Sequence, residues 1–300
     1  MTAEYGQTAP MTNDAHHAPF DTALLKQRRA KGAFGPDFLL RLAGEELLLR
    51  LTEGNAASAA GGVLALCGPA WLAEQAARAW KGGTLLRCHW LAVHDGTPHT
   101  PQVVCDHARL PFAENSLDAA LVLFDFAFVN DLPAALRHWR RALKPGGRLL
   151  AALPGGETLH ELRAAWAAAE RQLAQQCYLG DSWAGPGWRV APFVDLQQLA
   201  RLAGMAGFAQ VVTDVERLRA RYADALALMR ELKDSGWANP LRARPRQPVS
   251  RHLLGLAAAH YELAFAEDDG RVPATYELLY LSARKPGADE KSANDKACVI

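Results

Sequence analysis

Residues 103–156 constrain the fold more than any other part of this chain, because their pattern changes from extended to helical and back. Residues 117–124, LDAALVLF, are apolar almost throughout, as is typical of a strand that helices cover on both faces of a parallel sheet. From Asn130 the apolar residues take helical spacing, with Asp131 placed to cap the first turn. Residues 144–147, KPGG, end that helix, since proline cannot continue it. The stretch therefore predicts a βαβ unit.

Short motifs mark the loops of this unit: Asp106, LPF at 110–112, Asp118 and LKPGG at 143–147. Together they resemble the middle of the class I S-adenosylmethionine (SAM) dependent methyltransferases. The resemblance implies an α/β fold, a doubly wound Rossmann-like sheet of about seven strands whose last strand is antiparallel, with a helical insertion before that strand. It also implies SAM as the cofactor, bound at the carboxyl ends of the strands.

Composition and charge fit a globular, enzyme-like chain of 300 residues, with 50% hydrophobic and 22% charged residues. The net charge of +1 gives no indication of a nucleic-acid partner. No apolar run approaches the roughly eighteen residues that span a bilayer, and the polar start MTAEYGQTAPMTNDAHH is not a signal peptide. We therefore expect a cytoplasmic protein without a transmembrane segment, whose contact with a membrane complex would be peripheral.

We expect one methyltransferase-like domain between two polar tails. The tails, 1–19 and 286–300, are predicted to be disordered. The domain, 20–285, divides into N-terminal helices at 20–56, a core sheet at 57–215, a helical insertion at 216–274 and the final strand at 275–285. The N-terminal helices should lie across the edge of the sheet where the ligand binds.

The sequence indicates no metal site. The five cysteines, at positions 67, 88, 105, 177 and 298, show no paired metal-ligand spacing, and we expect buried free thiols. Glu157 and His160 are three residues apart, but without a second cluster such a pair is typical of a helix surface. No set of two histidines and one carboxylate can be assembled. A hydroxylase activity would therefore rest on resemblance alone.

The expected cofactor loop departs from the family pattern. Residues 63–72, VLALCGPAWL, occupy the place of the first strand and glycine loop, which implies cofactor contacts from Cys67 and Gly68. The family has an acidic residue at the position of Ala65 and three glycines in a loop one residue longer. The next strand, at 84–93, should end in an acid for the ribose hydroxyls but offers no convincing carboxylate. We therefore expect SAM to bind weakly or not at all.

Four further residues are expected at the cofactor. Asp106 and His107 stand where the family uses an aspartate to accept the adenine amino group; a loop aspartate that caps its own turn is the alternative. Phe124 and Asp125 follow the central strand, at the mouth of the sheet. Asp125 is also a candidate catalytic carboxylate, since an acid among aromatic residues can have a shifted pKa. A plain helix-entry aspartate is the alternative.

Motifs in the second half narrow the resemblance: GGETLHELR at 155–163, APF at 191–193 and VPATYEL at 272–278. With them, most of the chain resembles the bacterial relatives of a mitochondrial complex I assembly factor that has a methyltransferase fold. That family is described as hydroxylating an arginine of a complex I subunit. The resemblance therefore implies a protein substrate, a complex I subunit, although Ala127 replaces the family's usual histidine near the site.

We predict a substrate surface on one rim of the cofactor cleft. A helix that starts after Gly155 and Gly156 should point free N–H groups at the cleft. Glu161 is a candidate catalytic residue, because a carboxylate can hold a substrate guanidinium; structural ion pairs of Glu161 and Arg163 are the alternative. The predicted substrate-binding residues are Thr158, Glu161, Arg163, Trp183, Trp188 and Tyr276.

Two basic segments stand out from the balanced charge of the chain. They are the helix predicted at 22–31 and the proline-rich loop at 242–248, RARPRQP. The helix is a solvated surface, a contact for an acidic partner or a lid over the cofactor cleft. The loop is a solvated loop or a contact for an acidic partner or an anionic carrier.

Three functions stay open. The first is modification of a protein arginine, here hydroxylation, in complex I assembly. The second is O-methylation of a small molecule or an acyl carrier, as in biotin synthesis. The third is a non-catalytic assembly role in which the SAM site has eroded.

Overall fold

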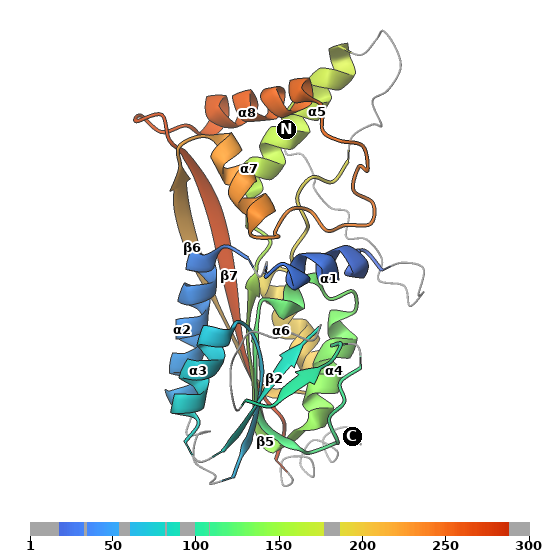
Figure 1. Cartoon of the computed structure of the whole chain (residues 1–300), viewed down its shortest axis with the longest axis vertical. Helices are drawn as coiled ribbons and strands as arrows, with labels where there is room; N and C mark the ends of the chain where they lie inside the picture. The colour runs from blue at the N-terminus through green and yellow to red at the C-terminus, as the bar shows by residue number, and fades with distance from the viewer. Residues whose placement is uncertain are drawn as a thin grey trace, which may run out of the picture.

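A seven-stranded sheet in the order β3-β2-β1-β4-β5-β7-β6 forms the centre of the computed structural model, which describes residues 18–32, 35–53, 61–81, 83–90, 100–107, 109–176 and 187–287 (Figure 1). Neighbouring strands are parallel, except that β7 runs antiparallel to both β5 and β6. This confirms the predicted α/β fold with an antiparallel last strand. The strands are β1 (Val63–Cys67), β2 (Thr84–His89), β3 (Gln102–Val104), β4 (Leu117–Leu123), β5 (Leu143–Pro154), β6 (Ala209–Tyr222) and β7 (Val272–Arg284).

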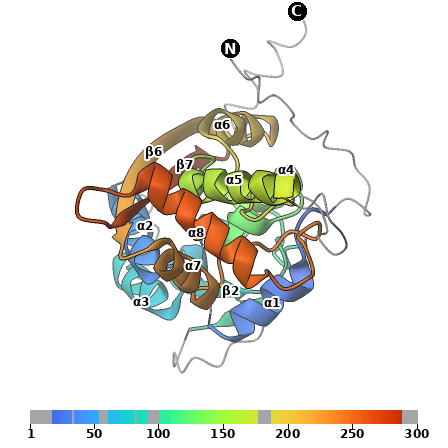
Figure 2. The same cartoon turned by 90° about the horizontal axis from the view of Figure 1, so that it is seen from above.

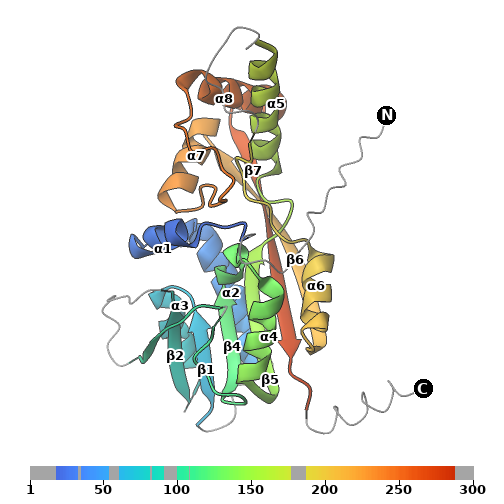
Figure 3. The same cartoon turned by 90° about the vertical axis from the view of Figure 1, so that its right-hand side faces the viewer.

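Helices cover both faces of the sheet. One face packs against α2 and α3, and the other against α4 and α6 (Figure 3). Because both faces are covered, every residue of β4 except Asp118 is buried, which explains its apolar sequence. Among the described residues, no helix combines the length and the apolar character that crossing a bilayer requires. The helices are α1 (Thr22–Ala30), α2 (Asp37–Glu53), α3 (Ala70–Ala79), α4 (Leu132–Ala142), α5 (His160–Gln176), α6 (Leu196–Met205), α7 (Ala225–Asp234) and α8 (Arg251–Phe265), with a 3-10 turn, η2, at Asp125–Phe128.

The central βαβ unit has the predicted arrangement. Asp131 caps α4, since its carboxylate accepts a hydrogen bond from the N–H of Ala134 at 2.8 Å. The KPGG turn lies inside β5, where the pairing with β4 shifts register between Leu117 and Ala119, and its Gly146 has a φ of +79°, a value that favours glycine. An ion pair of 2.8 Å between Lys144 and Asp118 joins this turn to β4. The turn residues therefore hold β5 next to β4.

Strands β6 and β7 extend beyond the other strands as a ribbon, and α5, α7 and α8 pack around its far end; we call these three helices the helical lid (Figure 1). The predicted sheet limits at 215 and 275 are too narrow, because pairing continues to Tyr222 and Val272. The alternation of exposed arginines with less exposed Leu218 and Ala220 is a period-two pattern that favours a strand. The lid also includes α5, which precedes β6 and lies beside α8 (Figure 2).

Candidate cofactor and substrate site

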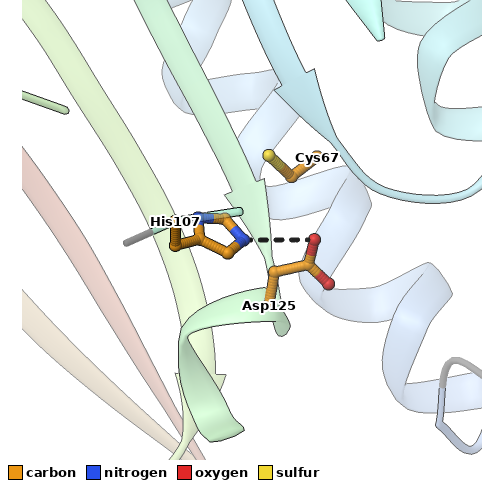
Figure 4. A group of neighbouring side chains, drawn as sticks. All are labelled: Cys67, His107 and Asp125. Atoms are coloured by element: carbon orange, nitrogen blue, oxygen red, sulfur yellow. Dashed lines mark ion pairs between the residues drawn. The ribbon is translucent and has the colours of Figure 1, made fainter. Parts of the chain in front are cut away.

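Three polar side chains converge at the carboxyl edge of the sheet (Figure 4). Cys67 is the last residue of β1, Asp125 follows β4, and His107 lies in the turn after β3. One ligand atom from each residue lies within 4.8 Å of the others. The carboxyl ends of parallel strands meet at one edge, so residues predicted separately as cofactor contacts do come together.

The carboxylate of Asp125 is held by a cation from α1. Its Oδ1 lies 2.6 Å from Nη2 of Arg29, and its Oδ2 lies 3.6 Å from Nε2 of His107. Both side chains of the Arg29–Asp125 pair are only 15% exposed. Burial alone would raise the pKa of Asp125, but the charge of Arg29 and the hydrogen bond from His107 outweigh it and hold that pKa below its usual value. The site therefore contains an ionised carboxylate.

The protonation of His107 follows from its neighbour Trp139. The indole N–H of Trp139, which can only donate, lies 3.1 Å from Nδ1 of His107. Nδ1 must therefore be the acceptor, and the ring proton sits on Nε2, facing Asp125. Sequence analysis did not identify Trp139 as a site residue; its place on the packed side of α4 was the only indication.

This cluster does not fit a divalent cation. Nε2 of His107 carries a proton, so its lone pair is not available to a metal. Asp125 is already neutralised by Arg29, and burial raises the pKa of the Cys67 thiol to about 11, so a metal would have to displace both Arg29 and the thiol proton. The donor set therefore favours an organic cation at Asp125 over a metal ion.

The loop after β1 is as short as predicted. Only Gly68 and Pro69 separate Cys67 from α3, and no side chain caps the first turn of that helix. A Cβ at residue 68 would lie 3.0 Å from Cδ2 of Leu72, so the glycine allows the helix to approach the strand. The start of α3 offers backbone N–H groups that suit an anionic group such as a carboxylate.

The end of β2 lacks the ribose-binding acid of the family pattern, as the sequence indicates. The strand ends in Cys88 and His89, which are both buried, and Ala65 on the neighbouring β1 is also buried. Asp95, the next carboxylate along the chain, lies outside the described residues. Within the described part of the chain, β2 therefore presents no carboxylate at its end for a ribose.

Asp106 is exposed just beyond β3, where a ligand can reach it. The turn there is closed by the backbone, since the N–H of Arg109 donates to the carbonyl of Asp106 at 2.8 Å.

Phe124 does not face a ligand with its side chain, which is 1% exposed and packs edge-on against Trp237. The predicted cofactor contact of the Phe124 side chain is therefore wrong in this structure. Its φ of +60° instead turns the chain so that Asp125 reaches the edge.

The predicted substrate residues on α5 and β7 are internal. Glu161 is 3% exposed and accepts hydrogen bonds from the backbone N–H of Thr275 at 3.1 Å. Thr158 is fully buried and donates through its hydroxyl to the carbonyl of Glu277. Tyr276 is fully buried too, with its hydroxyl 2.9 Å from that of Tyr222. Direct partner contacts from these three residues are incompatible with this arrangement, since Thr158 and Glu161 bond α5 and the turn before it to β7, and Tyr276 bonds to Tyr222 of β6.

In the turn before α5, the N–H groups of Gly155 and Glu157 are bonded to β7 and do not point freely at the cleft. The N–H of Gly155 donates to the carbonyl of Glu277 at 2.8 Å, and the N–H of Glu157 donates to the carboxylate of the same residue at 3.1 Å. Glu277 is 6% exposed and was not predicted; the acid inside the VPATYEL strand was the indication. The predicted anion site is therefore already filled by β7.

Among the described residues predicted to bind substrate, Trp188 and Arg163 keep access to solvent. Trp188 is 56% exposed, and Trp183 lies outside the described residues. Trp188 and Arg163 line a cavity of about 650 Å³ beside α5. Arg163 also donates to the carbonyl of Gly156 at 2.7 Å. It makes no ion pair with Glu161 within the described part of the chain. Arg163 is held by backbone carbonyls, whereas Glu161 accepts from the backbone N–H and the hydroxyl of Thr275 and lies 3.6 Å from Nδ1 of His160.

The strand order and a sequence match define the class of this protein. Residues 68–151 match the family model described as a methyltransferase domain, which starts at the β1 loop and ends in β5. The YcgJ protein from Bacillus subtilis has a similar fold, with a TM-score of 0.51 at 13% identity over 81% of this chain and 100% of that chain. Residues 68–151 are therefore similar to a methyltransferase domain, and the sheet has the fold of class I methyltransferases.

Curated relatives fall into two groups. Arginine-hydroxylase NDUFAF5, mitochondrial, from Danio rerio is 34% identical over 184 residues, which is 61% of this chain and 54% of that protein. The human protein of the same name is 33% identical over 182 residues, 61% of this chain and 50% of that protein. Malonyl-[acyl-carrier protein] O-methyltransferase from Halorhodospira halophila is 36% identical over 196 residues, 65% of this chain and 61% of that protein. The chain thus spans about half to three fifths of the length of these relatives.

The cofactor of the superfamily is SAM, and the described residues fit it in two places. Asp106 offers an exposed carboxylate where the resemblance puts the adenine amino group, and the uncapped start of α3 offers N–H groups for the carboxylate of the methionine part. Asp125 could receive the ammonium group only in exchange for Arg29. When bound, SAM supplies an electrophilic methyl group. The protein's own residues hold and orient it.

We expect weak SAM binding that depends on Asp106. Asp106→Ala should weaken binding by about 1–3 kcal/mol, since the adenine amino group loses its acceptor, or roughly 5- to 150-fold in Kd. Calorimetric titration of the two proteins with SAM measures this change. Glu114→Ala, at another exposed acid, is the control and should leave the Kd unchanged. Submicromolar binding by the wild type, or an unchanged Kd for Asp106→Ala, would contradict the expectation.

Proposed function

We propose that this protein uses the SAM site of its superfamily to act on another protein, and that its target is an arginine side chain of respiratory complex I. Modification by hydroxylation is the form that the NDUFAF5 relatives suggest, since their name is arginine-hydroxylase. Hydroxylation inserts an oxygen atom into a C–H bond, so it consumes a two-electron oxidant such as dioxygen with a reductant, which SAM does not supply. The proposal concerns the substrate and its modification. The match of residues 68–151 to a methyltransferase domain does not depend on it.

One observation carries the proposal: the carboxylate at the mouth of the sheet already holds a guanidinium. Asp125 binds Arg29 at 2.6 Å in a setting where both side chains are largely buried. A planar guanidinium matches a carboxylate in shape and charge. A substrate arginine would meet the same carboxylate in place of Arg29, with the protonated Nε2 of His107 on the other oxygen. Asp125 therefore replaces Glu161 as the candidate for holding the substrate.

The second candidate function is O-methylation of an acyl group on a carrier protein. The relative from Halorhodospira halophila that bears this activity in its name is as similar to this chain as the arginine-hydroxylases are. The third candidate is a non-catalytic assembly role. It is favoured by the bond between Arg29 and Asp125, which closes the mouth of the site in this structure.

Deletion of the gene in its host distinguishes these functions. Mass spectrometry of arginine peptides from purified complex I should show that one arginine loses its added oxygen atom in the deletion strain. The wild-type gene should restore the modification and Asp125→Asn should not. Asp37→Asn, at an exposed acid of α2, is the matched control and should restore it. The folding of each variant is checked by thermal unfolding.

Each alternative has its own outcome in this experiment. If the deletion strain requires biotin for growth and its complex I arginines are unchanged, arginine modification is refuted and the carrier-protein reaction is favoured. A lower amount of assembled complex I in the deletion strain that Asp125→Asn restores in full would favour the non-catalytic role. An added methyl group in place of the oxygen atom would keep arginine as the target and correct the chemistry.

A further inference from the structure

A basic surface lies beside the candidate site. It consists of α1 with its flanking residues, 19–32, and the segment 238–249, which we call the basic surface. These segments contain seven Lys or Arg residues and one acid, a net charge of +6, whereas the whole chain carries +1. The remaining residues are therefore acidic in sum. So uneven a distribution of charge indicates an electrostatic partner.

The two segments form one surface because they are bonded to each other. The N–H of Arg242 donates to the carbonyl of Pro19 at 2.8 Å, and the N–H of Asp21 donates to the carbonyl of Pro240 at 2.9 Å. Asp21, the only acid of the two segments, is paired with Arg244 at 3.0 Å. Its charge is therefore already used within the surface.

Three exposed cations of the basic surface make neither an ion pair nor a side-chain hydrogen bond within the described part of the chain: Lys26, Lys31 and Arg246. Arg246 belongs to a loop that is stiffened by three prolines, at positions 240, 245 and 248. A stiff loop that presents arginine loses little conformational freedom when it binds carboxylates. The surface is thus prepared for an acidic partner.

The composition of the basic surface favours a protein over other polyanions. Its one exposed large apolar side chain among the described residues is Val249, at 40% exposure. Binding of single-stranded nucleic acid uses exposed aromatic side chains for stacking, and insertion into a membrane surface uses exposed large apolar residues beside the cations. We propose that the basic surface docks an acidic face of a protein partner. This rests on the proposed function, since it describes the partner that would bring its side chain to Asp125.

The position of α1 connects docking to the site. Arg28 donates to the carbonyl of Gly236, which holds α1 against the segment after α7, while the next residue, Arg29, reaches Asp125. A partner that binds α1 therefore lies next to Arg29, the α1 side chain that pairs with Asp125 in the described structure. Docking and access to Asp125 share one helix.

The test measures binding without SAM or activity. Fluorescence anisotropy follows a labelled poly-glutamate peptide as it binds the full chain, with duplex DNA and phosphatidylserine vesicles as separate probes. The triple variant Lys26→Glu, Lys31→Glu, Arg246→Glu should weaken peptide binding about tenfold or more. Binding by the wild type should weaken as the ionic strength rises.

The matched control is Arg78→Glu, Lys81→Glu, Arg137→Glu, which makes the same change of charge at exposed residues of α3 and α4 and the turn after α3. It should reduce peptide binding by less than about twofold. Equal losses in both triple variants would overturn the proposal, and so would tighter binding of DNA or vesicles than of the peptide. Arginine modification that persists without peptide binding would refute only the docking surface, and binding without modification would refute only the proposed function.

Discussion

Asp125→Ala should lower the free energy of unfolding by about 3–5 kcal/mol, because it leaves the guanidinium of Arg29 inside the protein without its carboxylate. The two side chains are each 15% exposed, and their atoms are 2.6 Å apart. Water cannot replace the lost partner fully at such a site. Urea unfolding followed by circular dichroism measures the loss.

Two comparisons separate this pair from an ordinary surface pair. The double variant Arg29→Met, Asp125→Leu should lose less than Asp125→Ala alone, since no charge is left unpaired. Arg219→Ala removes an exposed partner of Glu267 and should cost about 1 kcal/mol or less. If Asp125→Ala costs no more than Arg219→Ala, then the Arg29–Asp125 pair does not stabilise the fold.

The contribution of the Arg29–Asp125 pair to stability should also depend on pH. The pKa of Asp125 lies below its usual value in the folded protein, so its contribution to stability is complete above the ordinary carboxyl pKa. That contribution is lost as the pH falls through the folded pKa, which puts the loss below about pH 4. The wild type and Asp125→Ala should therefore converge in stability in acid, and a constant difference down to low pH would contradict the assignment.

Glu161→Ala should cost about 2–4 kcal/mol, because the buried backbone N–H of Thr275 loses its acceptor and the Thr275 hydroxyl loses its partner. Glu161→Gln should cost less, since its amide oxygen can still accept one of these bonds. Thermal and urea unfolding rank the stabilities of the wild type, Glu161→Gln and Glu161→Ala. A Glu161→Ala protein as stable as the wild type would return Glu161 to the list of candidate substrate residues.

The sheet and its central helix could be predicted because their residues carry local patterns. The apolar run of β4, the helical spacing after Asp131 and the KPGG turn each specify one element and its end. The carboxyl-edge rule then brought Cys67, His107 and Asp125 together without any side-chain information. These parts of the prediction depend on neighbours in sequence or on topology.

The partners of the site residues could not be predicted, because they come from distant segments. Arg29 is 96 residues from Asp125, and Glu161 is 114 residues from Thr275. No periodicity identifies such pairs, and a carboxylate that binds a substrate looks the same in sequence as one that binds a strand. Glu161 was therefore placed on a surface where the structure has a buried hydrogen bond.

The continuous ladder between β6 and β7 decides which side of the molecule can open. After one register shift between Ala209 and Val212, it runs unbroken from Val212–Ser282 to Tyr222–Val272, so the ribbon carries the helical lid as an extension of the sheet. Tilting the lid would bend two strands across their hydrogen bonds. Helix α1 lies outside this ladder, and side-chain contacts hold it in place, among them the ion pair of Arg29 with Asp125, the hydrogen bond of Arg28 to Gly236 and the buried Leu25. Ligands therefore have their easiest entrance at α1, and exchange of a bound molecule should follow the movement of that helix while the ribbon stays rigid.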